Sequence, residues 1–583
     1  MDHQSSVHRF SEEPVAAPTA ILEVLAAAGV EYIYGMSGGN TGHLYRALSE
    51  LDGAIRPILT RHESLATVMA EAYGRLTGRV GVAVGQGSWL LTNGGVGILE
   101  AHVGSSPVVL LADLTDFAPY TQHAPYQAAM GSHGTWDAAA AYRAMTKETH
   151  LPLDPVEAVQ SVQQAVRAAV SGEPGPVAVL FHSRSLAGDV DPSSSPRVYG
   201  TDSYLKEAVP SYPAVEEIAE ILTRAERPVL IAGGGVRTAR AYAQLEQLVE
   251  ATGVAVATTA SGKGVLPEVH PLSVGVMGNY GEPTANVAIG EADTIVAVGT
   301  RLAPTDTCFE NPDLIDPERQ LIIQIERDPR NANWTYPADH LVLGDAGVAL
   351  GRLVKAVEAL GGVPEERLLE RRSHVEGVRE RNGYFTLPLG SSPSAPIHPQ
   401  RLIASLNAAT ESSAIVTCDA GENRLLMNRY FQTKDAGSFL QPAGAGGMGY
   451  AIPAALAART VYPHRQVVAV CGDGGFGMSM SGLLTSLEED LPICVIVFNN
   501  RMLGWVRHGQ GEAAVASELS EFDHAEVARS LGANGIRVEE PSQLADALRS
   551  ALDSERTTVV DVMVSDQETF LDIMSPLAAA GRP

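Results

Sequence analysis

Cysteine, aromatic residues and positive charge are all scarce in this chain of 583 residues. Only 4 residues are cysteine and 5% are aromatic. The cysteines are too few and too far apart for a disulfide framework or a zinc-binding pattern. They are Cys308, Cys418, Cys471 and Cys494. Their scarcity predicts a reduced, cytoplasmic setting.

The charge balance excludes two classes of partner. Lys and Arg number 41 against 68 Asp and Glu, a formal net charge of −27. Such a chain is not attracted to nucleic acid or to an anionic membrane surface. No apolar run approaches the roughly 18 residues that a membrane-spanning helix needs, and the N-terminus lacks the order of a secretory signal. We expect a soluble protein whose partners are small molecules or further copies of itself, with no nucleic acid and no membrane.

Glycine and proline are abundant, with 57 Gly and 35 Pro, and short apolar runs alternate with helical periodicity. This alternation is typical of α/β domains built on parallel sheets. Helices are expected over 63–78, 365–381 and 476–488. Strands are expected over 80–84, 108–112, 177–181, 254–258, 294–298, 467–471 and 493–498.

Two stretches rich in Pro and Ser, residues 189–197 and 390–399, read as linkers. They predict an N-terminal domain over 1–188, a central domain over 198–375 and a C-terminal domain over 390–583. Each block has the size of an ordinary domain, about 100–200 residues. We therefore predict three doubly wound parallel-sheet domains, the first and third being similar in architecture.

The strongest chemical signal is GlyAspGly at 472–474 followed by AsnAsn at 499–500, each after an expected strand. Ligands of open parallel sheets bind at the carboxyl ends of the strands, where these side chains meet. Carboxylate and amide oxygens suit Mg²⁺, which proteins commonly share with phosphate groups. Glycine backbone and the N-terminus of the next helix favour the same phosphates. The pattern predicts a metal–diphosphate site.

This motif resembles the thiamin diphosphate motif, and the match extends to the acetohydroxyacid synthase and pyruvate oxidase-like family. The resemblance implies pyrimidine-binding, central and diphosphate-binding domains. It implies thiamin diphosphate and Mg²⁺ as cofactors, and a homodimer or homotetramer with active sites at the subunit interface. Other segments that follow the family's order are 35–40, 61–63, 69–78, 85–93, 172–177, 445–450 and 574–576.

The resemblance also implies catalytic and substrate-facing residues. Glu63 would hydrogen-bond the cofactor's aminopyrimidine and take part in proton transfer. His123 or Gln127 would orient a substrate carbonyl or move a proton; a solvated loop position is the alternative for both. The implied substrate-facing residues are Gly38, Gln86, Tyr126, Trp505 and Gly509.

For the metal and the cofactor, the implied ligands are Asp473, Asn500 and the main-chain carbonyl of Met502. Met448 matches the bulky residue that holds the cofactor in its bent form. The remaining implied cofactor positions are Gly421, Asn423, Gly446, Gly447, Gly472, Gly474 and Gly475.

Several positions depart from the family pattern. Gly509 stands where a tryptophan is usual and Trp505 where a methionine is usual, which predicts a reshaped acceptor pocket. Trp89 and Gly482 also differ from the usual residues. Glu422 follows the predicted diphosphate segment and would repel a diphosphate unless its carboxylate points away.

We therefore predict an acetolactate synthase-like carboligase that takes a 2-oxo acid or related donor and a non-standard acceptor. A decarboxylase or lyase without ligation, or a flavin-linked 2-oxo acid oxidase, is the alternative. A non-catalytic binding protein is disfavoured because Glu63, Asp473 and Asn500 occur together. The glycine loops at 233–235, 258–264 and 275–281 are compatible with FAD, with an adenosine nucleotide or with no ligand. Their glycine pattern is too weak to predict an NAD-dependent oxidoreductase.

Overall fold

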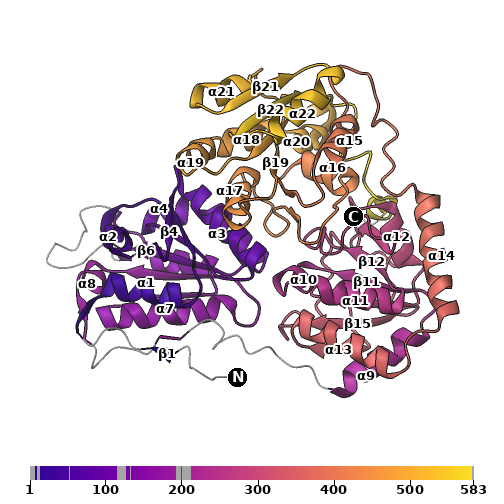
Figure 1. Ribbon diagram of the computed structural model, residues 1–583, viewed down its shortest axis with the longest axis horizontal. Coiled ribbons are helices and arrows are strands. Elements are labelled where there is room, and N and C mark those ends of the chain that lie inside the picture. Colours follow the sequence, from indigo (N-terminus) through magenta and orange to yellow (C-terminus); the bar gives the residue numbers. More distant parts are fainter. Residues whose placement is uncertain are drawn as a thin grey trace.

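A computed structural model describes residues 7–8, 13–51, 53–114, 127–131, 133–191, 198–199 and 212–580. Each of its three domains is built on a six-stranded parallel sheet (Figure 1). The N-terminal domain is drawn in indigo and purple, the central domain in magenta and salmon, and the C-terminal domain in orange and yellow. The predicted fold class is confirmed. His123 and Tyr126 lie outside the described residues.

The N-terminal domain has the strand order β4-β3-β5-β6-β8-β7. Its strands are β3 Tyr32–Gly35, β4 Arg56–Leu59, β5 Gly81–Gln86, β6 Val108–Asp113, β7 Glu148–His150 and β8 Pro176–Phe181. Its helices are α1 Ala17–Ala27, α2 Gly42–Glu50, α3 Glu63–Thr77, α4 Gly87–Thr92, α5 Gly95–Val103, α6 Ala138–Met145, α7 Pro155–Val170 and α8 Ser183–Leu186. Two short antiparallel pairs flank it, β1 Val7–His8 with β10 Val198–Tyr199 and β2 Val15–Ala16 with β9 Asp189–Val190.

The C-terminal domain has the order β18-β17-β19-β20-β22-β21, which repeats the N-terminal topology strand for strand. The predicted similarity of the two domains is confirmed. Its strands are β17 Ile415–Cys418, β18 Phe439–Leu440, β19 Val467–Gly472, β20 Cys494–Asn499, β21 Asn534–Val538 and β22 Thr558–Met563. Its helices are α15 Pro399–Ala409, α16 Glu422–Tyr430, α17 Ala451–Val461, α18 Asp473–Ser479, α19 Gly482–Glu488, α20 Gly504–Gln510, α21 His524–Leu531, α22 Leu544–Leu552 and α23 Pro576–Ala580.

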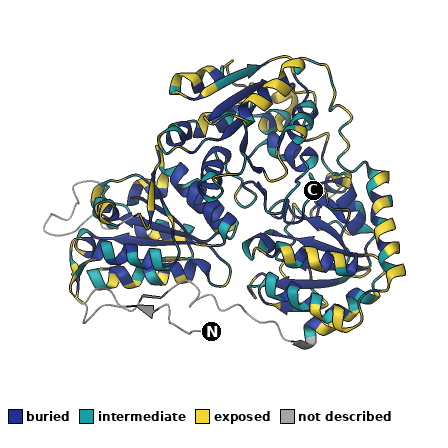
Figure 2. Cartoon of the chain, in the orientation of Figure 1, coloured by how far each residue is buried: buried dark blue, intermediate teal, exposed yellow. Residues whose placement is uncertain are grey.

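The central domain has a different order, β13-β12-β11-β14-β15-β16, which reverses direction between β11 and β14. Its strands are β11 Pro228–Ala232, β12 Ala255–Thr258, β13 Ser273–Val276, β14 Thr294–Val298, β15 Leu321–Glu326 and β16 His340–Leu343. Its helices are α9 Tyr212–Arg224, α10 Gly234–Thr238, α11 Tyr242–Thr252, α12 Pro283–Gly290, α13 Ala346–Ala359 and α14 Glu365–Asn382. In Figure 2 the sheet is dark blue, whereas α14 on the outside is largely exposed.

Helix α3 joins the N-terminal and C-terminal domains. Every residue from Leu65 to Leu76 is buried, because α3 lies between its own domain and α17 of the C-terminal domain. Small residues allow this close packing: a Cβ on Gly74 would lie 2.5 Å from the main-chain oxygen of Pro107. The apolar stripe expected on one face of this helix is therefore only part of its buried surface, which extends around the whole helix.

The helix predicted over 476–488 is in fact two helices, α18 and α19, which meet at Met480 and Ser481. Glycine and serine are frequent in this stretch and have weak helix propensity. A Cβ on Gly482 would lie 2.8 Å from a side-chain methyl of Ile452, so α19 packs closely on α17. Of the residues that the structure describes, no helix is both long and apolar enough to cross a membrane.

Candidate functional site

A cavity of about 110 Å³ lies at the carboxyl edge of the C-terminal sheet. Asp473 begins α18 directly after β19, and Asn500 follows β20. Both side chains line the cavity together with Met502 and Trp505. Parallel strands that end side by side therefore bring the two halves of the sequence motif together, as the order of elements predicts.

Ten of the predicted site residues line this cavity. They are Gly421, Asn423, Met448, Gly472, Asp473, Gly474, Gly475, Asn500, Met502 and Trp505. Gly446, Gly447 and Gly509 do not line it, although Gly446 and Gly447 directly precede Met448. Among the described residues, none from the N-terminal domain contributes to its lining.

Asp473 is the chemically distinctive group of the cavity. Its side chain is buried, with 6% exposure, and its Oδ1 accepts a hydrogen bond of 2.7 Å from the Gly474 amide. Its Oδ2 is buried and has no hydrogen-bond partner among the residues that the structure describes. Burial raises the pKa of this carboxyl. A buried carboxylate oxygen without a donor is costly unless a cation faces it, so the geometry suits a bound metal.

The type of metal follows from the other donors. The described part of the chain has no group of three His, Cys, Asp or Glu side chains that could hold a metal. An ion at Asp473 would therefore depend on amide and main-chain oxygens as well. Asn500 supplies an amide oxygen, which here accepts a bond of 3.3 Å from the Met502 amide. Oxygen ligands with a single carboxylate suit Mg²⁺.

Close backbone approach explains the glycines of the motif. A Cβ on Gly474 would lie 2.9 Å from Leu503 Cδ2 and 3.0 Å from Met448 Cε. A Cβ on Gly475 would lie 2.9 Å from the carboxyl carbon of Asp419. Any larger residue would displace the side chains that shape the cavity.

Asp419 directly precedes the cavity-lining residues Ala420 and Gly421 and holds main-chain amides next to Met448, a role that had not been predicted. Its Oδ1 accepts from the Gly449 amide at 2.9 Å, and its Oδ2 accepts from the Ala451 amide at 3.1 Å. Burial raises its pKa to about 6. The only signal in the sequence is its position at the end of an apolar run, where a carboxylate can meet main-chain amides.

Glu422 lines the cavity, but its carboxylate is held by other groups. Its Oε1 lies 2.7 Å from His508 Nδ1 and accepts from the Phe570 amide at 3.0 Å. Both Glu422 and His508 are mostly buried, at 7% and 13% exposure. Trp505 stacks on Phe570 with ring centres 5.2 Å apart. Helix α20 and the C-terminal segment therefore each supply a hydrogen-bond partner to this carboxylate.

In the N-terminal domain, Glu63 begins α3 and is only partly buried. Its Oε2 accepts a hydrogen bond of 2.9 Å from Asn93 Nδ2. Arg61, two residues earlier, pairs with Glu488 of α19. Within its own chain, Glu63 is not among the residues that line the 110 Å³ cavity.

The other predicted residues of this domain cluster at the carboxyl edge of its sheet. A Cβ on Gly38 would lie 3.1 Å from the side chain of Gln86. Gln127 has a positive φ of 62° and accepts a bond of 3.1 Å from the Ser88 amide. Its Nε2 donates at 3.4 Å to Asp113, a buried residue that had not been predicted.

Asp113 holds loop amides at the carboxyl edge of the N-terminal sheet, as Asp419 does at the carboxyl edge of the C-terminal sheet. It ends β6 and accepts hydrogen bonds from the amides of Gly87 at 2.9 Å and Asn40 at 2.8 Å. Burial raises its pKa. The two domains of equal topology therefore each place a buried aspartate at the carboxyl edge of the sheet to hold loop amides.

A larger cavity of about 280 Å³ lies at the carboxyl edge of the central sheet, where the strand order reverses. Segments of all three domains line it, including Ser105, Gly234 and Gly444. The glycine run at 233–235 serves packing in part, since a Cβ on Gly233 would lie 2.3 Å from the Gly299 main-chain oxygen. Gly234 lines the cavity, and a Cβ on it would lie 3.3 Å from Ser261 Cβ.

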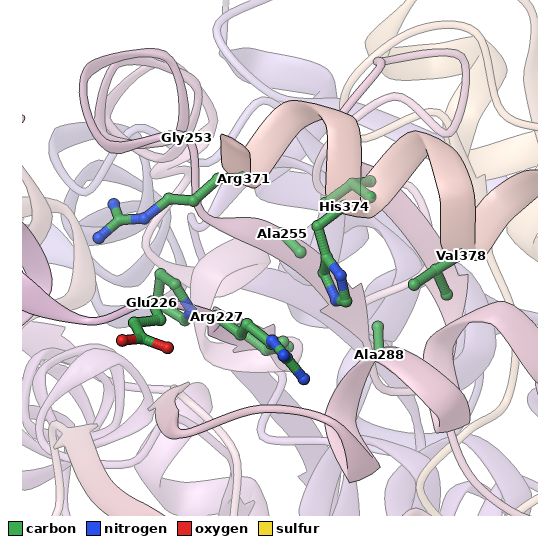
Figure 3. A pocket seen from close by; sticks show the side chains of 11 residues that line it. Glu226, Arg227, Gly253, Ala255, Ala288, Arg371, His374 and Val378 are labelled. Carbon is green, nitrogen blue, oxygen red and sulfur yellow. The ribbon is translucent and has the colours of Figure 1, made fainter. Parts of the chain in front are cut away.

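A third cavity, between α14 and the central sheet, is too small for a ligand. Figure 3 shows Arg371 and His374 of α14 above Arg227 and Ala255. Its volume is about 10 Å³, room for about one water molecule at most. Arg371 donates to main-chain oxygens of Leu222 and Thr252, so its role is to hold α14 in place.

Comparisons with known proteins agree with this arrangement. The chain matches the thiamine pyrophosphate enzyme family in three parts. These are the N-terminal TPP binding domain over 16–132, the central domain over 215–353 and the C-terminal TPP binding domain over 419–562. The predicted boundaries at 188, 198, 375 and 390 lie outside these matches and stay predictions.

The chain is similar over nearly its whole length to acetolactate synthase large subunits. It is 31% identical to a probable one from Methanocaldococcus jannaschii, across 94% of this chain and 92% of that protein. It is 29% identical to the isozyme 3 large subunit of Escherichia coli, across 95% and 96%. It is 28% identical to a putative thiamine pyrophosphate-containing protein of Bacillus subtilis, across 94% and 92%. The chain therefore belongs to the thiamin diphosphate-dependent enzymes of the acetolactate synthase-like family.

Proposed function

We propose that this enzyme uses thiamin diphosphate and Mg²⁺ to transfer an acyl unit from a 2-oxo acid or related donor to an acceptor other than the usual small 2-oxo acid. The observation that carries the metal site is the buried Oδ2 of Asp473, which lacks a hydrogen-bond partner at the edge of the cavity. Asn500 and the Met502 carbonyl would complete the protein ligands. The residues present fit a metal–diphosphate group.

The main-chain amides around Gly421 and Gly474, at the start of α16 and within α18, would donate to the diphosphate oxygens. Thiamin diphosphate supplies a carbon nucleophile and an electron sink. Glu63 would hold a proton at the aminopyrimidine nitrogen. Met448, whose Cε would lie 3.0 Å from a Cβ on Gly474, would support the ring system. Gln127, His123 or both would orient the substrate carbonyl.

We infer that Glu63 reaches such a cofactor from another subunit. None of the described residues that line the 110 Å³ cavity comes from the N-terminal domain. We infer a homodimer or homotetramer in which the N-terminal domain of one copy closes the cavity of the next. The partly buried Glu63 and the exposed Trp89, at 46% exposure, belong to the face that would do so.

The acceptor is expected to differ from that of acetolactate synthases because α20 presents a different surface. Trp505, Phe570 and Tyr280 form an aromatic cluster, with Trp505 and Tyr280 5.6 Å apart. A Cβ on Gly509 would lie 3.9 Å from Phe570 Cζ, in ordinary van der Waals contact, so a side chain at this position would lie against that ring and the glycine leaves it uncovered there. Incubating the loaded enzyme with a panel of 2-oxo acids and aldehydes and identifying the products tests this proposal. Carbon dioxide with no ligated product would favour the decarboxylase alternative.

The 280 Å³ cavity is the proposed place for FAD or another adenosine nucleotide. Four carboxylates and two arginines line it: Glu173, Asp306, Glu326, Asp345, Arg301 and Arg327. Burial raises the pKa of Asp306 to about 6 and also raises that of Glu326. Carboxylates suit ribose hydroxyls, and Arg301 and Arg327 suit the phosphate oxygens of such a nucleotide. The visible absorption spectrum of the purified enzyme distinguishes bound flavin, which makes the oxidase alternative feasible, from its absence.

Replacing His508 is expected to weaken cofactor binding. In His508→Ala the mostly buried Glu422 carboxylate loses its partner at 2.7 Å and remains beside the diphosphate segment. A buried carboxylate that keeps only the Phe570 amide as a partner, next to an anionic ligand, should raise the dissociation constant for thiamin diphosphate about 10- to 100-fold, as measured by equilibrium dialysis. His508→Gln keeps an N–H donor and should recover most of the affinity. If Glu422→Gln fails to rescue His508→Ala, the electrostatic explanation is wrong.

A further inference from the structure

A buried charged cluster between the N-terminal and C-terminal domains has no part in the proposed function so far. Glu71 and Arg75 of α3 pair at 2.5 Å, and Arg75 also pairs with Glu100 of α5 at 2.8 Å. The three side chains are 0%, 8% and 1% exposed. Tyr450 donates to Glu71 at 2.8 Å. Such a cluster is costly to bury unless all of its groups are paired.

Glu100 uses the rest of its carboxylate to hold a loop of the other domain. Its Oε1 accepts from the Gly444 amide at 2.9 Å. Its Oε2 accepts from the Ala445 amide at 2.8 Å and the Gly446 amide at 3.2 Å. Three successive amides that converge on one carboxylate form an anion-binding nest. Arg75 adds a bond of 2.6 Å to the main-chain oxygen of Gln441.

The held loop leads directly to Met448, which lines the 110 Å³ cavity. Gly446 and Gly449 both have positive φ, at 76° and 83°, so the backbone turns on either side of Met448. The Gly449 amide is fixed by Asp419 at 2.9 Å. Glu100 of the N-terminal domain therefore holds the backbone before Met448, and Asp419 of the C-terminal domain holds the backbone after it.

The charge of Glu100 is suited to this task. Burial favours its neutral form, but the Arg75 guanidinium and the amides of Gly444 and Gly446 outweigh that effect and lower the pKa of Glu100. Hydrogen bonds from amides to an ionised carboxylate are stronger than those to a neutral acceptor. The contact between the two domains is therefore made by an ionised carboxylate. Arg75 neutralises its charge, and the amides of the loop donate hydrogen bonds to it.

We propose that Glu100 is a positioning residue that sets the location of Met448 by clamping residues 444–446. The inference rests on the proposed function, because it matters for catalysis only if Met448 supports the cofactor. Glu100 itself does not line the cavity and acts through the loop. The clamp also means that the N-terminal domain helps to shape the C-terminal cavity within one chain.

Amide hydrogen exchange of the apo-protein, followed by mass spectrometry of peptides spanning 441–449, tests the clamp directly. These residues form no helix or strand, so in the unaltered protein protection of the 444–446 amides must come from Glu100. In Glu100→Gln, which keeps the shape but loses the charge, we expect their exchange to be about 10- to 100-fold faster. Peptides from β20 serve as the internal control. Unprotected 444–446 amides in the unaltered protein, or unchanged exchange in the variant, would overturn the proposal.

A double-mutant cycle separates this inference from the proposed function. The readout is the rate of C2 proton exchange in bound thiamin diphosphate with Mg²⁺. We expect Glu100→Gln and Met448→Ala each to slow it, and Glu100→Gln to have little further effect in the Met448→Ala background. Additive effects would show that Glu100 does not act through Met448. No effect of Met448→Ala would instead remove the proposed role of Met448 while the exchange of the 444–446 amides still reports on the clamp.

Discussion

Asp473→Asn should abolish the Mg²⁺ dependence of cofactor binding while leaving the fold intact. The substitution keeps the size of the side chain and the oxygen that accepts from the Gly474 amide at 2.7 Å. It removes the negative charge that the buried, unpartnered Oδ2 offers to a cation. Substituting a residue that only orients a metal ligand typically lowers metal affinity about 10- to 100-fold, and loss of a direct anionic ligand lowers it at least as much. We expect the dissociation constant for thiamin diphosphate with Mg²⁺ to rise at least about 100-fold in equilibrium dialysis.

The matched control is Asp546→Asn, on α22 of the same domain, whose side chain is 84% exposed. This variant loses the same charge at a residue that does not line the cavity, and it should bind cofactor normally. Thermal unfolding of both variants should be close to that of the unaltered protein. Because burial raises the pKa of Asp473, neutralising it should even relieve part of the desolvation cost in the apo-protein. Undiminished Mg²⁺-dependent binding by Asp473→Asn would exclude Asp473 as a metal ligand.

Glu63→Gln should slow proton exchange at C2 of the bound cofactor by about 10²–10⁴-fold, the range that general acid–base catalysis supplies. The variant keeps a hydrogen-bonding side chain at the start of α3, so packing of α3 should not change. Its bond with Asn93, 2.9 Å long, can also be kept after a flip of the amide. Affinity for the diphosphate end should stay within about threefold, because Glu63 lies outside the diphosphate cavity. Equal exchange rates would remove Glu63 from the mechanism.

The fold could be predicted well because it rests on local patterns. The expected strand 294–298 has the bounds of β14, and 108–112 falls one residue short of β6. In both cases a run of β-branched and aliphatic residues is buried on both faces of a parallel sheet. The helix expected over 476–488 was wrong as a single element, since the chain turns at Met480 and Ser481. Helical periodicity continues across such a turn and cannot reveal it.

The site could be predicted only where its residues follow strand ends. Asp473 and Asn500 could be placed together because topology brings strand ends to one edge. Asp419 and Glu100 were missed, since a carboxylate that binds amides of a distant loop leaves no pattern in the sequence. Glu422 could be recognised as a departure, but its attachment to His508 depends on the packing of α20. The relation of Glu63 to the cavity depends, in our proposal, on a second chain.

Mixed dimers of Glu63→Gln and Asp473→Asn chains, made by co-expression with two different tags, test the shared active site most directly. If Glu63 of one copy serves Asp473 of the other, each mixed dimer has one intact site and one site that lacks both residues. We predict that mixed dimers bind about one cofactor per dimer, and that its C2 proton exchanges at the rate of the unaltered enzyme. Exchange as slow as in the Glu63→Gln homodimer would contradict a site built from two copies.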